Sequence, residues 1–451
     1  MNRYKTAILT VLTLCFSNVQ ALEVTNNTEL HGFFSQGYVY SPDNDFAGSD
    51  SEDGGFNFRE IGINGSWNAN EQFRVTGQLL SRTMDEVDDG QVRVDFLLAD
   101  YLAYSGEQST FGIRLGRVKN ELGVYNSTRD IPSARPGVNV PNAIYFDAFR
   151  DTMISTDGLN FYGSVFSGVG TLNWSAFTGS TELESKVMEN YLFAQDIQGK
   201  FDEVGLSGLK LNFSPSRQPS LNFGISLLKL DTNMSDLQTA AQAGYALQTS
   251  DPVTDAATYA ATPVEYGGLG LVPETDGQFE QYVGQAAQKE ASDNYEDYIT
   301  AVDMEALFAI LSVQYAYADW LFSAEYLIID SDIDLGLLGS LVPIETTTEG
   351  YVLQAEWFFK ESLTAMLRYE ELYLLNDDRD GSKSARDNDP YHGYGKGLTI
   401  GLGWDITTDW RLTGQMSTNE GTVWLPSYDG FENEDIKKHW KTYMLQIAYQ
   451  F

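Results

Sequence analysis

Residues 440–451, at the end of the chain, read Trp-Lys-Thr-Tyr-Met-Leu-Gln-Ile-Ala-Tyr-Gln-Phe. Large apolar side chains recur at every second position of this stretch, at Tyr443, Leu445, Ile447 and Tyr449. Successive side chains of a β-strand point to opposite faces, so this period of two predicts a strand with one apolar face and one wetted face. The strand ends on the aromatic Phe451.

The beginning of the chain has the features of a secretory leader. Arg3 and Lys5 precede an apolar run over 6–16, and the run is followed by Val19 and Ala21, as signal peptidase requires. We therefore expect a signal peptide over 1–21 and an exported domain over 22–451. The one cysteine lies within this leader, so the mature chain is expected to form no disulfide and to have no cysteine nucleophile.

About sixteen segments of roughly ten residues repeat the alternating pattern, which is the length that a tilted membrane strand needs. The predicted strands are 29–40, 55–67, 71–82, 91–105, 109–117, 157–166, 169–178, 205–213, 219–230, 304–318, 319–330, 350–360, 362–374, 396–407, 409–418 and 440–451. The connections between them alternate strictly between short and long. This favours a barrel with tight periplasmic turns and long extracellular loops over a soluble sandwich.

The predicted fold class is therefore all-β, a transmembrane antiparallel β-barrel of about sixteen strands. No run of roughly 18 apolar residues follows the leader, so a helical membrane protein is excluded. One strand does not fit simply, because Asp95 and Asp100 differ in parity. Either a β-bulge interrupts this strand or its register is misassigned.

Charged residues at lumen-facing positions are close to balance, although the chain carries a formal net charge of -36. The charged residues expected at these positions are Arg74, Arg82, Arg93, Arg114, Lys210, Arg368 and Arg411 against Glu60, Asp95, Glu325, Glu356, Glu370 and Asp405. Of these, the predicted pore lining is Arg74, Arg82, Arg368, Arg411, Glu325, Glu356, Glu370 and Asp405. The excess acid must lie in the long loops, where it attracts cations and repels nucleic acid. The longest of these, at 233–303, has Lys289 as its one basic residue and could be a lid, a binding site or a solvated loop.

The third long loop, at 118–156, is the only large loop without net acid, and it contains prolines and aromatic residues with which to pack against itself. It begins within the stretch Gly-Arg-Val-Lys-Asn-Glu-Leu-Gly-Val-Tyr-Asn at 116–126, which continues to Thr-Arg-Asp at 128–130. This stretch and the terminal Ala-Tyr-Gln-Phe at 448–451 resemble the corresponding parts of sixteen-stranded porins of Gram-negative outer membranes. The long acidic loop at 233–303 departs from compact general porins.

The resemblance implies a water-filled channel for passive diffusion of small hydrophilic solutes or ions, and a homotrimer. It also implies a place in the outer membrane, in contact with lipid and lipopolysaccharide. The terminal strand would then be the signal for the barrel assembly machinery, through Tyr443, Leu445, Ile447, Tyr449 and Phe451.

On the same resemblance, the loop at 118–156 would fold inward and narrow the channel. The expected constriction residues are Arg114, Lys119, Arg129, Asp130, Arg135, Asp147 and Arg150. The loop arginines would face lumen groups such as Arg114 or Glu356 across the pore and would sort solutes by charge. A slight preference for anions is expected there, so that Arg129→Glu or Arg135→Glu lowers the anion-to-cation permeability ratio. The alternative is that the arginines pair locally with Asp130, Asp147 and Asp151 and only stiffen the loop.

A calcium site is a further candidate, with no other cofactor expected. The turn at 376–387 has oxygen donors spaced as in a calcium loop, with Gly381 at its sixth position. The candidate ligands are Asn376, Asp378, Asp380 and Asp387. Lys383 and Arg386 oppose a cation there, and a plain hairpin loop is the alternative.

Two other functions remain open from the sequence. A barrel hydrolase needs a histidine beside a hydroxyl or carboxylate. The three histidines, His31, His392 and His439, have no serine or carboxylate at a fixed spacing, so we expect no enzyme. A non-conducting adhesin or binding barrel could use the tyrosines of the loop at 233–303, and channel conductance distinguishes it from a pore.

Overall fold

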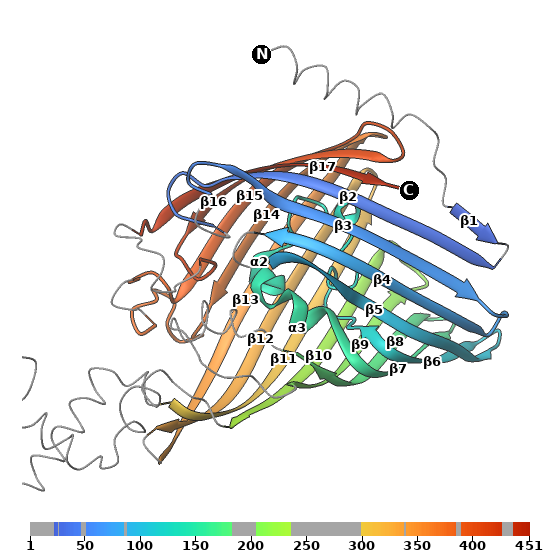
Figure 1. Ribbon diagram of the computed structural model, residues 1–451, viewed down its shortest axis with the longest axis horizontal. Helices are drawn as coiled ribbons and strands as arrows, with labels where there is room; N and C mark the ends of the chain where they lie inside the picture. The colour runs from blue at the N-terminus through green and yellow to red at the C-terminus, as the bar shows by residue number, and fades with distance from the viewer. Residues whose placement is uncertain are drawn as a thin grey trace, which may run out of the picture.

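The strands form one closed antiparallel barrel in the computed structural model (Figure 1). The structure describes residues 22–25, 27–46, 51–84, 88–182, 204–235, 299–337, 340–384, 389–425 and 436–451. The predicted signal peptide at 1–21 and most of the predicted loop at 233–303, from 236 to 298, lie outside this part of the chain.

The barrel strands are β2 (Thr28–Tyr40), β3 (Gly55–Asn68), β4 (Phe73–Met84), β5 (Asp88–Ser105), β6 (Ser109–Lys119), β7 (Ser155–Phe166), β8 (Gly170–Thr181), β9 (Val204–Pro215), β10 (Leu221–Ser235), β11 (Ile299–Tyr317), β12 (Trp320–Leu337), β13 (Ser340–Lys360), β14 (Leu363–Tyr373), β15 (Tyr394–Asp405), β16 (Trp410–Glu420) and β17 (His439–Gln450). Each pairs with the next along the chain, and β17 pairs with β2 to close the ring. A short strand, β1 (Leu22–Thr25), adds to the edge of β2. The predicted barrel of sixteen strands is confirmed.

Side chains alternate between the two faces of the wall as the terminal strand predicts. In β17, Tyr443 and Leu445 are exposed on the outside, whereas Met444 and Gln446 are buried on the inside. The same outward exposure of large apolar residues recurs around the ring, at Ile63, Leu79, Leu97, Leu115, Phe161, Ile225, Leu311, Leu353, Leu367, Ile400 and Leu402. An apolar belt around a closed barrel is a surface that faces lipid, and strand-built barrels of this kind are outer-membrane proteins. The chain is therefore placed in the outer membrane.

Aromatic pairs mark the end of the wall at which the short turns lie. Trp320 stacks on Trp357 with ring centroids 5.4 Å apart, and Trp410 lies 4.8 Å from Tyr449. Such residues concentrate where a barrel meets the membrane interface. None of the helices in the described ranges is long and apolar enough to cross a membrane.

The C-terminal residue is hydrogen-bonded to β2. The backbone N–H of Phe451 donates to Gly32 O at 3.0 Å, and Gly32 N–H donates back to Phe451 O at 3.2 Å. A Cβ on Gly32 would lie 2.6 Å from the Phe451 ring, so the ring needs glycine there. The last residue thus continues the hydrogen bonding of the β17–β2 seam.

The β-bulge predicted as one explanation for Asp95 is present. In the β4–β5 ladder Gln78 faces Phe96 while Leu79 faces Val94, which leaves Asp95 without a partner across the strands. The extra residue changes the parity of the strand. As a result both Asp95 and Asp100 are buried inside the barrel, with relative exposures of 3 % and 5 %.

The prediction of a long loop between the strands 319–330 and 350–360 is wrong. β12 and β13 stay paired out to Leu337 and Ser340, so the connection is short and the strict alternation of turn lengths fails here. Asp330, Asp332 and Asp334 belong to β12. Beyond the hydrocarbon region both faces of a strand meet water, so acidic residues are compatible with a paired strand there.

Candidate functional site

The segment 118–156 lies inside the barrel, where Figure 1 shows α2 (Asn142–Tyr145) and α3 (Arg150–Ile154) within the ring of strands. Its backbone is bonded to one side of the wall. Val124 N–H donates to Glu325 of β12 at 2.8 Å, and Ala143 N–H donates to Glu370 of β14 at 2.9 Å. Further along, Val138 N–H donates to Gln415 of β16 at 3.0 Å.

Ion pairs bind the same segment to the other side of the wall. Arg135 pairs with Glu60 of β3, and Arg150 pairs with Asp95 of β5 at 3.1 Å. Gln78 of β4 donates from Nε2 to Asp130 at 2.7 Å. The segment therefore crosses the lumen and is held on both sides.

A dense network of arginines and carboxylates fills the space beside β3, β4 and β5. Arg82 contacts Glu60 at 3.4 Å and Asp88 at 3.5 Å, and it also pairs with Asp147. Arg129 donates to Asp147 at 2.7 Å. The arginine side chains of this network are 2–5 % exposed at Arg82, Arg129, Arg135 and Arg150. Charges buried this deeply are costly unless they are paired or hydrogen-bonded.

The titration of the loop groups follows from burial and from these partners. Burial alone would raise the pKa of Asp147, but Arg82, Arg129 and Arg150 hold it well below its usual range. Burial lowers the pKa of Arg129 to about 10, although Asp147 opposes this. Burial and the neighbouring Glu325 raise the pKa of Tyr145 well above its usual value. At neutral pH Asp147 and Arg129 are both charged, and Tyr145 keeps its proton.

Tyr145 and Glu325 form the main polar anchor of the segment. The Tyr145 hydroxyl donates to Glu325 Oε1 at 2.7 Å and accepts from Val124 N–H at 2.6 Å. Gly123 passes close to both groups with a φ of +49°, and a Cβ there would lie 2.1 Å from the Tyr145 hydroxyl oxygen. Close approach and a left-handed conformation both favour glycine at this position.

The loop arginines do not have the partners expected of them. The structure joins Arg129 and Arg150 to the loop acids Asp147 and Asp151, as in the local alternative, and joins Arg135 to the wall through Glu60. Lys119 likewise pairs with Asp130 at 2.7 Å. The prediction that these arginines face Arg114 or Glu356 across the pore is therefore wrong. They pair instead with nearer carboxylates from the loop and from β3 and β5.

The remaining predicted lining residues point into the lumen with other partners. Arg114 lies over the Tyr162 ring at 4.0 Å and contacts Asp100 at 3.5 Å and Glu121 at 3.3 Å. Arg74 also pairs with Asp100 at 3.1 Å, and Arg411 pairs with Asp405 at 2.8 Å. Arg368 donates to Gln354 Oε1 at 2.8 Å and to the backbone of Asn139 at 3.2 Å, while Gln354 donates to Glu356 at 2.9 Å.

The lumen-facing pattern predicts Glu60, Gln78, Asp95 and Gln354 on the inner face, but not their contacts with the loop. Further members of the site were absent from the predicted set, namely Asp88, Asp100, Tyr145 and Gln415. Lumen-facing parity was the available signal for Gln415. It fails at Asp88, because β5 begins three residues earlier than expected.

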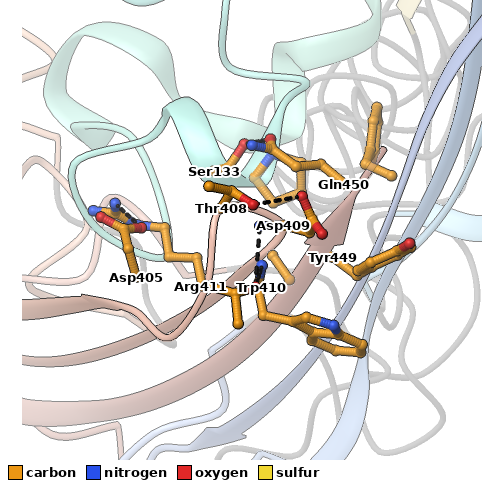
Figure 2. A pocket seen from close by; sticks show the side chains of 12 residues that line it. Ser133, Asp405, Thr408, Asp409, Trp410, Arg411, Tyr449 and Gln450 are labelled. Carbon is orange, nitrogen blue, oxygen red and sulfur yellow. Dashed lines mark hydrogen bonds and ion pairs between the residues drawn. The ribbon is translucent and has the colours of Figure 1, made fainter. Parts of the chain in front are cut away.

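A small hollow lies where the segment reaches the periplasmic turn between β15 and β16 (Figure 2). Ser133, from the 3-10 turn η2 (Pro132–Ala134), donates to Gln450 at the end of β17. The hollow has a volume of about 20 Å³, enough for a single water molecule. It is a packing feature at the foot of the loop and is too small for a solute.

The predicted calcium turn uses its oxygens internally. Asp378 accepts from the backbone N–H groups of Lys383 and Ser384, both at 2.9 Å, and Asp380 accepts from Ser382. Asp387, one of the candidate ligands, lies outside the described residues. Within the part of the chain that the structure describes, no group of three or more metal-ligating side chains is arranged to hold an ion.

No known family model matches the chain, and no curated protein matches it significantly. Among solved structures, the anion-selective porin from Comamonas acidovorans is 12 % identical with a TM-score of 0.49, over 94 % of this chain and 99 % of that one. The outer membrane channel DcaP of Acinetobacter baumannii is 11 % identical with a TM-score of 0.49, over 96 % and 100 %. The outer-membrane OmpT of Vibrio cholerae is 8 % identical with a TM-score of 0.48, over 96 % and 100 %.

Likenesses at this level carry no argument for a function of this chain. The pairing of its own strands makes it a closed antiparallel barrel of sixteen strands, the fold that the resemblance implied.

Proposed function

We propose that this protein is a porin-like channel through which small hydrophilic solutes and ions diffuse passively across the outer membrane. The observation that carries the proposal is the segment 118–156, which lies inside the barrel and is bonded to both sides of its wall. A loop fixed in this way narrows the lumen at a defined level. Polar and charged side chains at the lumen positions supply the wetted surface that a solute needs.

The proposal includes no catalysis. His392, the histidine nearest a carboxylate among the described residues, lies with its Nδ1 3.7 Å from Asp389 Oδ2, and the Thr422 hydroxyl donates to the same carboxylate at 2.7 Å. All three side chains are almost fully buried, at 0–3 % exposure. A nucleophile and base must be reachable by substrate, so this group is better suited to holding the loops together.

The assembly and the surroundings of the barrel belong to the same proposal. It would work as a homotrimer in outer-membrane lipid and lipopolysaccharide, after insertion by the barrel assembly machinery. Free calcium is not required in this scheme, because Asp378 already has backbone and side-chain donors.

Ion preference is proposed to follow the acidic excess of the chain and not the loop arginines. Arg129 and Arg135 are buried in pairs with Asp147 and Glu60, so their charge is largely cancelled where it lies. Replacing either with glutamate would break a buried pair before it changed the field in the pore. This reverses the slight anion preference expected from the sequence.

Single-channel recording in planar bilayers tests the proposal. The folded mature chain should give stepwise openings, and Tyr145→Ala should change their size or noise because it removes the anchor to Glu325. Tyr101→Ala, at an exposed outward position of β5, is the matched control and should conduct as the parent does. Silence from correctly folded protein would favour an adhesin or binding barrel, and hydrolysis of lipid or peptide substrates would favour an enzyme.

A further inference from the structure

An apolar groove runs across the outer surface of the barrel between β11 and β15. Its volume is about 330 Å³, and it is lined by Phe322, Ala324, Leu353, Ala355, Tyr369 and Leu398 among others. Phe322 faces Ala355 across the ladder, and Ala324 faces Leu353, so each large side chain stands beside a small one. Ala324 and Ala355 are therefore the small residues of this lining, each beside a larger side chain on the neighbouring strand.

Polar groups lie directly beyond the groove on the same outward face. Glu371 follows Tyr369 on β14, and its carboxylate accepts from the hydroxyls of Tyr351, Tyr369 and Tyr373. Tyr369 therefore belongs both to the groove and to this cluster. A carboxylate on a lipid-facing wall is costly unless hydrogen-bond donors surround it. Here three tyrosine hydroxyls donate to the Glu371 carboxylate.

Lys396 is the cation of this cluster that has no close ion pair among the described residues, although its charge also acts on Glu371 and Glu420. It faces Glu371 in the ladder, and its Nζ lies 5.4 Å from the Tyr394 ring and 6.0 Å from the Tyr373 ring. Among the described residues no carboxylate oxygen comes within 4.0 Å of this Nζ. The two neighbouring cations form ion pairs, Arg379 with Glu349 and Lys438 with Glu420 at 3.2 Å.

The distance between the apolar groove and the charged cluster matches the distance between the acyl chain and the headgroup of a lipid. Tyr326 of β12 lies in the same cross-strand row as Glu371 and Lys396. Phe322, in the groove, lies four residues away from Tyr326 along β12. At about 3.3 Å per residue this is roughly 13 Å, close to half of a hydrocarbon core of about 30 Å. The charged cluster lies at the end away from the short Ala318–Asp319 turn, which puts it at the outer leaflet.

We propose that this face binds a lipid of the outer leaflet that carries a phosphate in its headgroup. One acyl chain lies in the groove over Ala324 and Ala355, and the phosphate is bound by Lys396 above the tyrosine rings. The proposal uses the orientation of the barrel in the membrane and does not depend on whether the pore conducts.

Native mass spectrometry of the folded mature chain, released from detergent, tests this proposal. The probes are lipid A, phosphatidylglycerol and a diacylglycerol with the same chains but no phosphate. Lys396→Gln should lower the retained fraction of both phosphorylated lipids about fivefold and leave diacylglycerol unchanged. Ala355→Phe fills the groove and should lower all three.

The matched controls lie on outward positions elsewhere. Lys229→Gln removes an exposed outward cation on β10, and Ala176→Phe enlarges an outward alanine on β8. Both should retain lipid as the parent does, and heat-modifiable migration on gels checks that every variant is folded. Parent-like lipid binding by Lys396→Gln and Ala355→Phe would overturn the proposal. Displacement of the phosphorylated lipids by inorganic phosphate alone, or a change of oligomeric state in Ala355→Phe, would also overturn it.

Discussion

Arg150 and Asp95 form an ion pair with side chains that are 3 % and 1 % exposed. Replacing Arg150 with methionine would leave Asp95 buried, with Gln78 as its remaining donor at 3.1 Å. We expect Arg150→Met to lower the free energy of unfolding by about 3–5 kcal/mol, as for other buried pairs that lose one partner. Urea unfolding of the barrel in lipid vesicles measures this change.

The pair Arg74–Asp100, in which the arginine is exposed, supplies the control. Arg74 is 48 % exposed, so Arg74→Met should cost at most about 1 kcal/mol. Adding Asp95→Leu to Arg150→Met should recover part of the lost stability, because no buried charge then lacks its partner. Equal costs for Arg150→Met and Arg74→Met would contradict the buried network.

Asp147 gives the network a dependence on pH. Its pKa is lowered in the folded state by Arg82 and Arg129, so its contribution to stability is complete above its unfolded pKa of about 3.9. That contribution is lost as the pH falls toward the folded pKa. We expect the unfolding temperature to fall between about pH 5 and pH 2, and Asp147→Asn to show a flatter profile with lower stability at neutral pH. A parent-like slope in Asp147→Asn would assign the acid effect to other groups.

The sequence predicted which charged residues lie in the lumen better than it predicted their partners. Parity alone places Arg82 and Glu356 on the inner face, and the structure agrees. The partner of Arg150 depends on the bulge at Asp95 and on the path of the loop across the barrel, and neither is a local property. Long-range pairing of this kind has no signal in a periodic pattern.

Among elements, the inner loop is the one most dependent on a single backbone position. Gly123 has a φ of +49° and lies against Tyr145 and Glu325, where a Cβ would meet atoms at 2.1 and 2.7 Å. Gly123→Val should release the loop from β12 while the barrel remains folded, because the strand ladders are untouched. Faster proteolysis within 118–156 and noisier single-channel current would report it.

Gly168→Val is the matched substitution. Gly168 lies in the turn between β7 and β8, and a Cβ there would meet nothing within 4 Å. Its current and its proteolysis should match those of the parent chain. Parent-like behaviour of Gly123→Val as well would show that the loop does not rely on this contact.

Strands were predictable wherever lipid and water face opposite sides of the wall. β16 and β17 have the period of two over their whole length, and their predicted ends agree with the structure within two residues. The pattern fails in the outer parts of β12 and β13, where Asp332 faces Glu345 on an exposed face. Both sides meet water there, so the hydrophobic alternation that marks a membrane strand is absent.

At the scale of the whole molecule, the charge balance inside the barrel contrasts with the chain's net charge of -36. Most of the described lumen arginines contact carboxylates, as Arg82, Arg114 and Arg150 do, whereas Arg368 donates to Gln354 and to the Asn139 backbone. The uncompensated acid therefore acts on ions mainly from outside this paired region, over distances set by salt.

We therefore expect a cation preference that depends on ionic strength. The Debye length is about 10 Å at 0.1 M salt and about 3 Å at 1 M, so distant fixed charge acts on a permeating ion only in dilute salt. Reversal potentials in KCl gradients should give a cation-to-anion permeability ratio above one near 0.1 M that falls toward one near 1 M. A permeability ratio that is the same at both concentrations would indicate an unpaired charge in the narrowest part of the pore. An anion preference in dilute salt would indicate that the loop arginines set the selectivity.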